Sequence, residues 1–390
     1  MTAAQELRDL ARPEVAAAIT AGADALDEVA RLNATVAGLE TSLSAATIAR
    51  DAALGVVAQR DADIAALKKR IAELEGGPTE TTGRFPGDPG PGKVIVGLAT
   101  TRGDLTQLQQ REQALGSGLA FRVYDNGGIG DLAVPGGPIA KKVLRDHAAG
   151  RITVCSPKPG IEALAAHRHE TELVAFFRWL EQQPGVTYVT VHHEPENDWT
   201  ADHGNLPAMA KHAADYREAQ RWVRACLNKA AGGKPKRTVF IGSLLTYSWT
   251  AQGKAKFGPV DQWNPGLQAD GAHVWDMAGG DHYEPAYTAG SLDTLKWRDF
   301  VASVKSWGCL PAITELGINN GNAKGGQVLA AFLKKLVGYG VPLVLYFDSK
   351  AGQGGALQSN PKDWWLLTDA NGTLPAFAEF AKAVGVNPNA

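Results

Sequence analysis

Eight short apolar runs, spaced regularly after residue 93, constrain the fold more than any other feature of this sequence. Each run is rich in aliphatic and β-branched side chains, and several of the intervals between runs have helical periodicity. The predicted strands are 94–99, 120–124, 152–156, 186–192, 239–244, 274–277, 311–314 and 343–347. Near-continuous apolar strands that alternate with amphipathic helices are typical of a parallel sheet covered on its faces. Eight such units predict an α/β fold, the (β/α)8 TIM barrel.

The intervals between the predicted strands support this interpretation. The clearest helical segments are 162–183, 209–230, 292–307 and 327–339. An open, doubly wound sheet is the alternative fold, and it would need a glycine-rich phosphate turn after its first strand. The sequence there reads Leu-Ala-Thr-Thr-Arg-Gly and lacks the dinucleotide fingerprint. We therefore prefer the closed barrel.

The first part of the chain follows a different pattern, the heptad repeat. Apolar residues recur at alternating steps of three and four, namely Val29, Leu32, Val36, Leu39, Leu43, Ala46, Ala53, Val57, Ile64, Leu67, Ile71 and Leu74. This pattern predicts an N-terminal α-helical coiled coil that joins two or three copies of the chain into a homo-oligomer. Arg50 and Arg60 fall on the seam and weaken its middle. An amphipathic helix packed on its own domain is the alternative.

Three segments follow from these patterns. Residues 1–77 form a helical head and the coiled-coil stalk, and the head is interrupted at Pro13. Residues 78–92 contain too much proline and glycine for a helix or a sheet, which predicts a linker. Residues 93–390 form the barrel domain.

Charge, cysteine content and hydropathy exclude several classes of function. A formal net charge of -2, from 39 basic and 41 acidic residues, gives no field that would attract nucleic acid. The three cysteines are far apart, which indicates buried thiols rather than disulfides or a zinc site. No segment approaches the ~20 apolar residues that cross a bilayer, and the first residues carry no secretory signal. We therefore expect no membrane insertion and no secretion through a signal peptide.

Polar side chains gather where the predicted strands end. Residues 186–199 read Val-Thr-Tyr-Val-Thr-Val-His-His-Glu-Pro-Glu-Asn-Asp-Trp, so a buried strand changes abruptly into imidazoles and carboxylates. The second predicted strand contains Arg122 near its end, and later strands are followed by Lys158, Asp281 and Glu315. In a TIM barrel the loops at the carboxyl ends of the strands form the active face. These side chains are therefore expected to meet there.

Glu315 and Glu194 are the two carboxylates that best fit a reaction. Glu315 lies in the apolar run Ala-Ile-Thr-Glu-Leu-Gly-Ile, where burial of a charge without a function is costly. A structural ion pair with Arg122 or Lys158 is the alternative explanation. Glycoside cleavage needs one acid to protonate the leaving oxygen and a second carboxylate at the anomeric carbon. We assign Glu194, in a loop, as acid and then base, and Glu315 as nucleophile.

These residues carry a resemblance. Residues 193–195, His-Glu-Pro, together with Glu315, resemble the clan A retaining glycoside hydrolases, whose pattern is Asn-Glu-Pro followed by a glutamate on strand seven. Histidine in place of asparagine is similar to the family 26 mannanase-like branch, which has His-Glu-x-Asn. Asn197 stands one place later than the asparagine of that branch. The resemblance covers residues 93–386.

The resemblance implies further roles. Residues 280–285, Gly-Asp-His-Tyr-Glu-Pro, resemble the strand-six motif of this branch, in which a tyrosine hydrogen-bonds the nucleophile. That role passes to Tyr283, and His193 would orient the sugar 2-hydroxyl or Glu194. The other residues expected to bind substrate are Asn197, Asp281 and Arg122. No cofactor is expected.

Aromatic platforms for sugar rings are also implied. Five tryptophans lie in predicted loops, namely Trp199, Trp249, Trp263, Trp364 and Trp365. Of these, we predict Trp199, Trp249 and Trp364 as substrate-binding residues. Hydrophobic packing under a loop is the alternative for each.

A metal site is the competing interpretation of the polar cluster. His192, His193, Asp281 and His282 offer nitrogen and oxygen ligands. Neighbouring strand residues point to opposite faces, and neither His192 nor His193 has a second histidine at ligand spacing. We therefore predict no metal.

The sequence favours a retaining glycoside hydrolase on a coiled-coil stalk. A helical head, a stalk, a Pro/Gly linker and a sugar-cleaving barrel resemble minor tail proteins of phages that infect actinobacteria. That resemblance implies a virion location, a cell-envelope polysaccharide as substrate and other tail proteins as partners. The alternatives are a non-catalytic glycan-binding adhesin on the same barrel, a tail protein whose stalk is its main function, and a cytoplasmic enzyme.

Overall fold

The computed structural model describes residues 83–115, 119–125, 136–284, 288–350 and 357–389, with scattered residues among the first 43. The chain divides into two compact units, Met1–Glu80 and Thr81–Ala390. In the first unit, the described residues are helical. Most of the predicted coiled coil, including its seam arginines, lies outside the described residues, and its oligomeric state stays a prediction.

The second unit contains a closed barrel of eight parallel strands, as predicted. The strands are β1 Val94–Thr100, β2 Ala120–Asp125, β3 Thr153–Pro157, β4 Thr187–Val189, β5 Thr238–Leu245, β6 Met277–Glu284, β7 Leu310–Ile318 and β8 Leu343–Asp348. They pair in chain order from β2 to β8, and β1 closes the barrel by pairing with both β8 and β2. A short strand, β9 Gly385–Val386, pairs with the beginning of β1.

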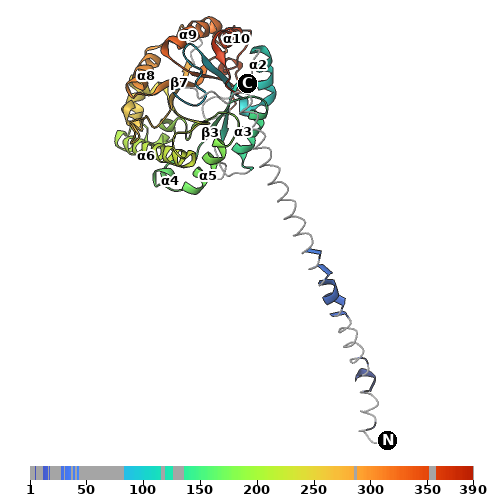
Figure 1. Cartoon of the computed structure of the whole chain (residues 1–390). Helices are drawn as coiled ribbons and strands as arrows, with labels where there is room; N and C mark the ends of the chain where they lie inside the picture. Colours follow the sequence, from blue (N-terminus) through green and yellow to red (C-terminus); the bar gives the residue numbers. More distant parts are fainter. Residues whose placement is uncertain are drawn as a thin grey trace, which may run out of the picture. The chain divides into compact units, whose positions relative to one another are not determined.

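Helices surround the strands (Figure 1). They are α2 Leu105–Leu115, α3 Pro138–Ala148, α4 Ile161–Ala165, α5 Glu170–Glu181, α6 Leu206–Ala231, α7 Ala251–Phe257, α8 Leu295–Ser306, α9 Gly325–Tyr339 and α10 Thr373–Val384. The single helix that we predicted over 162–183 is wrong, because α4 and α5 are separate. His167 and His169, with φ of 55° and 65°, break it by adopting the left-handed conformation.

Side chains of each strand alternate between the inside of the barrel and the helices outside it, as the pleat requires. The inner core contains Ile95, Ala120, Val154, Tyr188, Ile241, Met277, Ala312 and Leu345. The outer core, between strands and helices, contains Phe121, Cys155, Val189, Phe240, Ala278, Ile313, Leu316 and Tyr346. Toward the carboxyl ends of the strands, the inward positions change from apolar to polar residues, which places the polar cluster at one end of the barrel.

The amino-terminal end of the barrel is closed by residues that we predicted to be linker. Phe85 is only 3% exposed, belongs to the inner core and lies edge-on to Tyr188 at 6.5 Å between ring centroids. Arg84 pairs with Asp88 at 2.8 Å and stabilises the turn. From the other end of the chain, the Asn389 side chain accepts a hydrogen bond from the Val186 backbone at 2.8 Å. The linker prediction is therefore corrected for residues 83–92, which fold onto the barrel.

The fourth, sixth and seventh predicted strands have clearly different bounds in the structure, and the seventh is Leu310–Ile318 rather than 311–314. The sixth strand is Met277–Glu284 rather than 274–277. Gly279 lies within this strand, and a Cβ there would lie 2.3 Å from Thr314, so the inside of the barrel leaves room only for glycine. The fourth strand ends at Val189, and the chain turns at His192, where φ is 60°.

None of the described helices combines the length and the apolar character needed to cross a bilayer. The thiols of Cys155, Cys226 and Cys309 are buried, as predicted.

Candidate active site

Strands β2 and β6 supply four inward-facing polar side chains at the carboxyl end of the barrel. Because residues two apart on a strand share a face, Arg122 and Tyr124 follow Ala120 of the inner core on β2. By the same rule, Asp281 and Tyr283 share the inward face of β6 with Gly279. The four side chains thus converge on one space.

Glu315 reaches the same space through a β-bulge in β7. Gly280 of β6 pairs with Ile313 of β7, and the next pair is Asp281 with Glu315. Thr314 is therefore an extra residue, and the alternation of faces shifts by one. Without this shift Glu315 would point outward to the helices. With it, Glu315 lies inside and only 7% of its surface is exposed.

Glu194 lies in the loop after β4. The backbone is left-handed at both His192 and Glu194, with φ of 60° and 49°, and the Glu194 N–H donates to the Ser243 carbonyl of β5 at 3.0 Å. Non-glycine residues adopt this conformation only when their surroundings require it, and such positions cluster at functional sites. The turn directs the Glu194 side chain toward the barrel axis.

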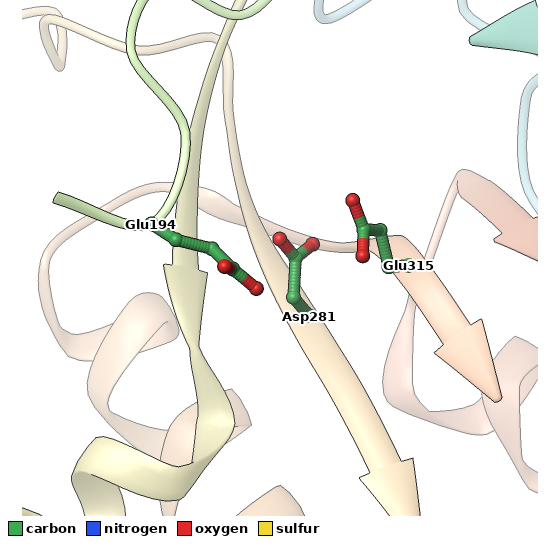
Figure 2. A group of neighbouring side chains, drawn as sticks. All are labelled: Glu194, Asp281 and Glu315. Carbon is green, nitrogen blue, oxygen red and sulfur yellow. The ribbon is translucent and has the colours of Figure 1, made fainter. Parts of the chain in front are cut away.

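Figure 2 shows the side chains of Glu194, Asp281 and Glu315 pointing toward one another, with Asp281 between the other two. One carboxylate oxygen of each lies within 4.8 Å of one oxygen of the other two. In glycosidases that retain the anomeric configuration, the two carboxyl groups are about 5–5.5 Å apart, whereas inverting enzymes separate them by about 6.5–9.5 Å. One oxygen of Glu194 and one of Glu315 therefore approach closely enough to agree with the shorter of these two spacings.

Glu315 is held by three groups. Arg122 Nη1 lies 3.0 Å from Oε1, and the Tyr124 hydroxyl donates to the same oxygen at 2.6 Å. The Tyr283 hydroxyl donates to Oε2, which confirms the hydrogen bond predicted for this tyrosine. The ion pair with Arg122 is also present, whereas Lys158 pairs instead with Asp198 at 2.6 Å. Arg122 therefore pairs with Glu315 whether Glu315 is a catalytic residue or a partner in a structural ion pair.

The Arg122 guanidinium is buried and serves several acceptors. It donates to the Thr314 carbonyl at 2.8 Å and to the Ser156 hydroxyl at 3.2 Å, and Nη1 lies 3.5 Å from Asp281. Burial acts to lower the pKa of Arg122, but Tyr124, Glu315 and Asp281 together hold it above its ordinary value. A permanent positive charge thus faces the carboxylates.

Glu194 and Asp281 have raised pKa values. Burial raises the pKa of Glu194 well above its ordinary value, and the charges of Asp281 and Glu315 raise it further. Burial, followed by the charge of Glu315, raises the pKa of Asp281 to about 7. Near neutral pH the cluster therefore holds a proton, and Glu194, the most exposed of the three, can deliver it to a bound molecule.

His193 faces this cluster as a neutral ring. Burial lowers its pKa well below the ordinary value, and the positive charge of Arg122 lowers it further. The Ser156 hydroxyl, which accepts from Arg122, lies 3.2 Å from His193 Nδ1. Donation from Ser156 to Nδ1 leaves the proton of the ring on Nε2, available to a ligand. His192 points elsewhere, with Nδ1 donating to the Pro159 carbonyl at 2.9 Å and Nε2 against Asp198.

The three tryptophans predicted as aromatic platforms differ in their surroundings. The prediction that Trp249 is a sugar platform is wrong. This side chain is only 4% exposed, packs on Phe300 and donates a hydrogen bond from Nε1 to the Ser303 hydroxyl. One face of Trp199 is stacked on His212 at 4.1 Å. Trp364 is partly exposed, and Lys350 Nζ lies 4.7 Å from its ring centroid.

Asn197 stays in the neighbourhood of the site without joining the cluster. Its backbone N–H donates to the Glu194 carbonyl at 3.1 Å, in the 3-10 turn Pro195–Asn197 that follows Glu194. The preceding residue, Glu196, is fully buried instead and accepts from the Leu245 N–H and the Ser248 hydroxyl, each at 3.1 Å. This pair of bonds ties the Glu194 loop to β5.

The sequence analysis missed Tyr124 and did not choose Trp365. Tyr124 could have been found, because it follows Arg122 by two residues on one strand and so shares its face. The Trp365 ring lies 4.9 Å from Tyr283, at the edge of the site. Its neighbour in the sequence, Trp364, gives the same signal, and only the structure separates the two.

The three carboxylates form the one acidic cluster of metal-binding size within the described residues. Arg122 Nη1 already lies 3.0 Å from Glu315 and 3.5 Å from Asp281. A divalent cation between these two carboxylates would face that buried positive charge. The three carboxylates beside Arg122 therefore suit proton transfer better than binding of a metal ion.

Comparisons with known proteins address the fold. No protein-family model matches the sequence, and a search of curated proteins finds no similar one. An endo-beta-1,4-mannanase from Thermotoga petrophila has a similar structure, with a TM-score of 0.50 and 10% identity over 76% of this chain and 78% of that chain. A Bacillus subtilis mannanase gives 0.48 and 11%, over 73% and 85%. A ruminal family 26 mannanase gives 0.47 and 11%, over 74% and 63%. At these identities the likeness concerns the barrel fold alone.

Proposed function

We propose that this chain is a retaining glycoside hydrolase. The observation that carries the proposal is the spacing within 4.8 Å of one oxygen of Glu194 and one of Glu315. Glu315 attacks the anomeric carbon while Glu194 gives its proton to the leaving oxygen, and the glycosidic bond breaks. Water then attacks the glycosyl ester, Glu194 takes its proton, and Glu315 is released as a carboxylate. The anomeric configuration is inverted twice and thus retained.

The surroundings of the two glutamates support these different roles. Glu194 has a raised pKa, which a carboxylic acid needs in order to donate a proton near neutral pH. It also lies in a loop, at the open end of the barrel. Glu315 is fixed by Arg122, Tyr124 and Tyr283, so its carboxylate has a defined direction. An adhesin on the same barrel would need neither a raised pKa nor an aligned pair of carboxylates, so the enzyme is the better interpretation.

The substrate that we propose is a cell-envelope polysaccharide with β-linked sugars, reached from a phage tail. The support is the sequence pattern of a helical head, a predicted coiled coil and a barrel. Homo-oligomerisation through residues 1–77 and contact with other tail proteins belong to the same proposal. The mannanase names of the structural neighbours agree with cleavage of a β-linked polysaccharide.

Release of reducing ends tests the reaction. The purified full chain is incubated with β-mannan, β-glucan, β-galactan and polysaccharide extracted from actinobacterial cell walls. We expect release from at least one of them, and loss of release in Glu315→Gln and Glu194→Gln. Glu162→Gln, at an exposed position of α4, is the matched control and should keep full activity. Binding without release by the wild type would favour the adhesin, and equal release by Glu315→Gln would remove the nucleophile assignment.

A further inference from the structure

The two oxygens of Glu315 are not equivalent. Oε1 accepts from the Tyr124 hydroxyl at 2.6 Å and lies 3.0 Å from Arg122 Nη1. Oε2 accepts from the Tyr283 hydroxyl only, among the described residues. A carboxylate oxygen has two lone pairs in its plane. Oε1 therefore accepts one hydrogen bond and lies against a positive charge, whereas Oε2 accepts one hydrogen bond, has no cation beside it among the described residues, and keeps a lone pair that can point at a ligand.

We infer that Oε2 is the attacking oxygen and that Tyr124 is a positioning residue that stabilises the charge returning to Oε1 when the glycosyl ester is cleaved. This inference rests on the proposed function and deepens it. During attack the new bond forms between Oε2 and the anomeric carbon, and Oε1 becomes the carbonyl oxygen of the ester. During hydrolysis the electron pair of that bond returns to Glu315 and the negative charge spreads to Oε1.

Tyr124 is built to remain a donor in this position. Its ring is fixed between Arg122, whose guanidinium carbon lies 4.9 Å from the ring centroid, and His193, whose ring is 5.5 Å away at 61°. Burial raises the pKa of the Tyr124 phenol well above its ordinary value, despite the opposing charge of Arg122. The hydroxyl thus keeps its proton over the working range of a glycosidase and donates it toward Oε1.

The hydrogen bond from Tyr124 acts differently on the two steps. Hydrogen bonds to an ionised acceptor are stronger than bonds to a neutral ester carbonyl. The bond is therefore stronger in the free carboxylate than in the ester, and it strengthens while the ester is cleaved. It assists hydrolysis of the ester, whereas during ester formation it mainly holds Glu315 in line. Loss of the hydroxyl should slow the second step. It should change the first step much less, because the poorer alignment of Glu315 is offset by a carboxylate that this hydrogen bond no longer stabilises.

The test compares Tyr124→Phe with the wild-type full chain. The probes are 2,4-dinitrophenyl β-glycosides of glucose, mannose, galactose, cellobiose and mannobiose. With this leaving group, kcat reports ester hydrolysis and kcat/KM reports ester formation. We expect kcat to fall by about 10- to 100-fold, the effect of one hydrogen bond to a charged group, with KM falling in parallel. Stopped-flow traces should show a burst of dinitrophenolate, and the mass of the protein should increase by one glycosyl group.

Two further variants serve as comparisons. In Tyr283→Phe the attacking oxygen loses its donor, so we expect kcat/KM to fall and no ester to accumulate. In Tyr216→Phe a buried hydroxyl without a hydrogen-bond partner among the described residues is removed, so both constants should match the wild type. Tyr216→Phe thus controls for the removal of a buried tyrosine hydroxyl away from Glu315.

The outcomes separate the inference from the proposed function. A parallel fall of kcat and kcat/KM in Tyr124→Phe without accumulation of ester, or no change in either, would overturn the role of Tyr124 while leaving the hydrolase intact. Failure of the wild type on every dinitrophenyl glycoside and every polysaccharide would contradict the hydrolase itself. If kcat and KM fall together in Tyr124→Phe, the result supports both the role of Tyr124 and the proposed hydrolase activity.

Discussion

At the scale of single residues, Asp281 is the neighbour that most affects the acid Glu194. After burial, the charge of Asp281 is the largest cause of the raised pKa of Glu194. A general acid works while it is protonated, so kcat/KM should fall as the pH rises through the raised pKa of Glu194. The position of this basic limb therefore depends on Asp281.

We predict that Asp281→Asn moves the basic limb of kcat/KM to lower pH by roughly one unit, because a like charge near Glu194 is removed. The measurement is the pH profile of kcat/KM on a polysaccharide that the wild type cleaves, because a sugar leaving group needs the proton of Glu194. Asp270→Asn, at an exposed position in a turn, controls for loss of a carboxylate elsewhere. An unchanged limb in Asp281→Asn would show that another group is the acid.

Glu196 is the second residue whose titration can be tested, in this case through stability. Burial raises its pKa to about 8, and its Oε2 has no hydrogen-bond partner in the described part of the chain. Because the folded-state pKa is raised, neutral Glu196 contributes stability that is lost as the pH rises from about 4.5 toward 8. The wild type should thus weaken over this window.

Glu196→Gln removes that titration. We expect the free energy of unfolding of this variant, relative to wild type, to increase by about 2 kcal/mol between pH 6 and pH 9. Urea unfolding at the two pH values, followed by far-UV circular dichroism, gives the difference. The same pH dependence in both proteins would show that Glu196 titrates normally.

At the scale of the elements, the bulge in β7 decides whether a site exists. Thr314 and Glu315 both face inward only because of the extra residue, and Thr314 sits against Gly279 of β6. A Cβ on Gly279 would meet Thr314 Cγ2 at 2.3 Å and Oγ1 at 2.4 Å. Glycine at this position is therefore a condition for the position of Glu315.

We predict that Gly279→Ala destabilises the fold by about 1–3 kcal/mol through overpacking and lowers kcat at least about tenfold, because β7 must shift. Gly290→Ala is the control, since a Cβ there meets nothing within 4 Å, and it should stay within about 0.5 kcal/mol of wild type. Thermal unfolding and kcat are measured for both. Full activity in Gly279→Ala would mean that the bulge does not fix Glu315.

The same elements show how far sequence reasoning reaches. The eight apolar runs predict the barrel, and residues two apart predict that Arg122 lies near Asp281 once both strands are known. A bulge leaves no mark in the sequence, because Thr314 looks like any other strand residue, so the inward direction of Glu315 could be inferred only from its chemistry. The predicted sixth strand stops at residue 277, before Gly279, because glycine is depleted in strands and its packing role in β6 leaves no separate mark in the sequence.

The tryptophans show a second limit of sequence reasoning. Trp249 and Trp365 both lie in predicted loops, and the sequence does not say which ring is covered. Trp249 packs against Phe300 of α8, whereas Trp365 lies beside Tyr283. The difference depends on contacts between segments far apart in the chain.

At the scale of the whole molecule, the predicted stalk gives a test that is independent of the site. Five apolar residues of the predicted seam are described, and in the single chain each is 49% to 70% exposed, namely Val29, Leu32, Val36, Leu39 and Leu43. Apolar residues at heptad spacing are buried when a second or third copy of the helix packs on them. This exposure supports the proposed homo-oligomer.

We predict that light scattering gives two or three times the chain mass for the full chain, and the mass of one chain for residues 81–390. The shorter chain should keep the kcat of the full chain on dinitrophenyl glycosides, because every residue of the candidate site lies in the second unit. A monomeric full chain would contradict the coiled coil. An inactive monomer of residues 81–390 would show that the barrel needs its partner.

The configuration of the first product tests the central claim most directly. Proton NMR of an actively cleaved substrate distinguishes the α and β anomers before mutarotation mixes them. With Glu194 and Glu315 oxygens within 4.8 Å of each other, the account predicts that the β-linked substrate first releases the β anomer. Release of the α anomer would contradict it, because a direct attack by water inverts the configuration and requires a wider spacing of the two carboxyl groups.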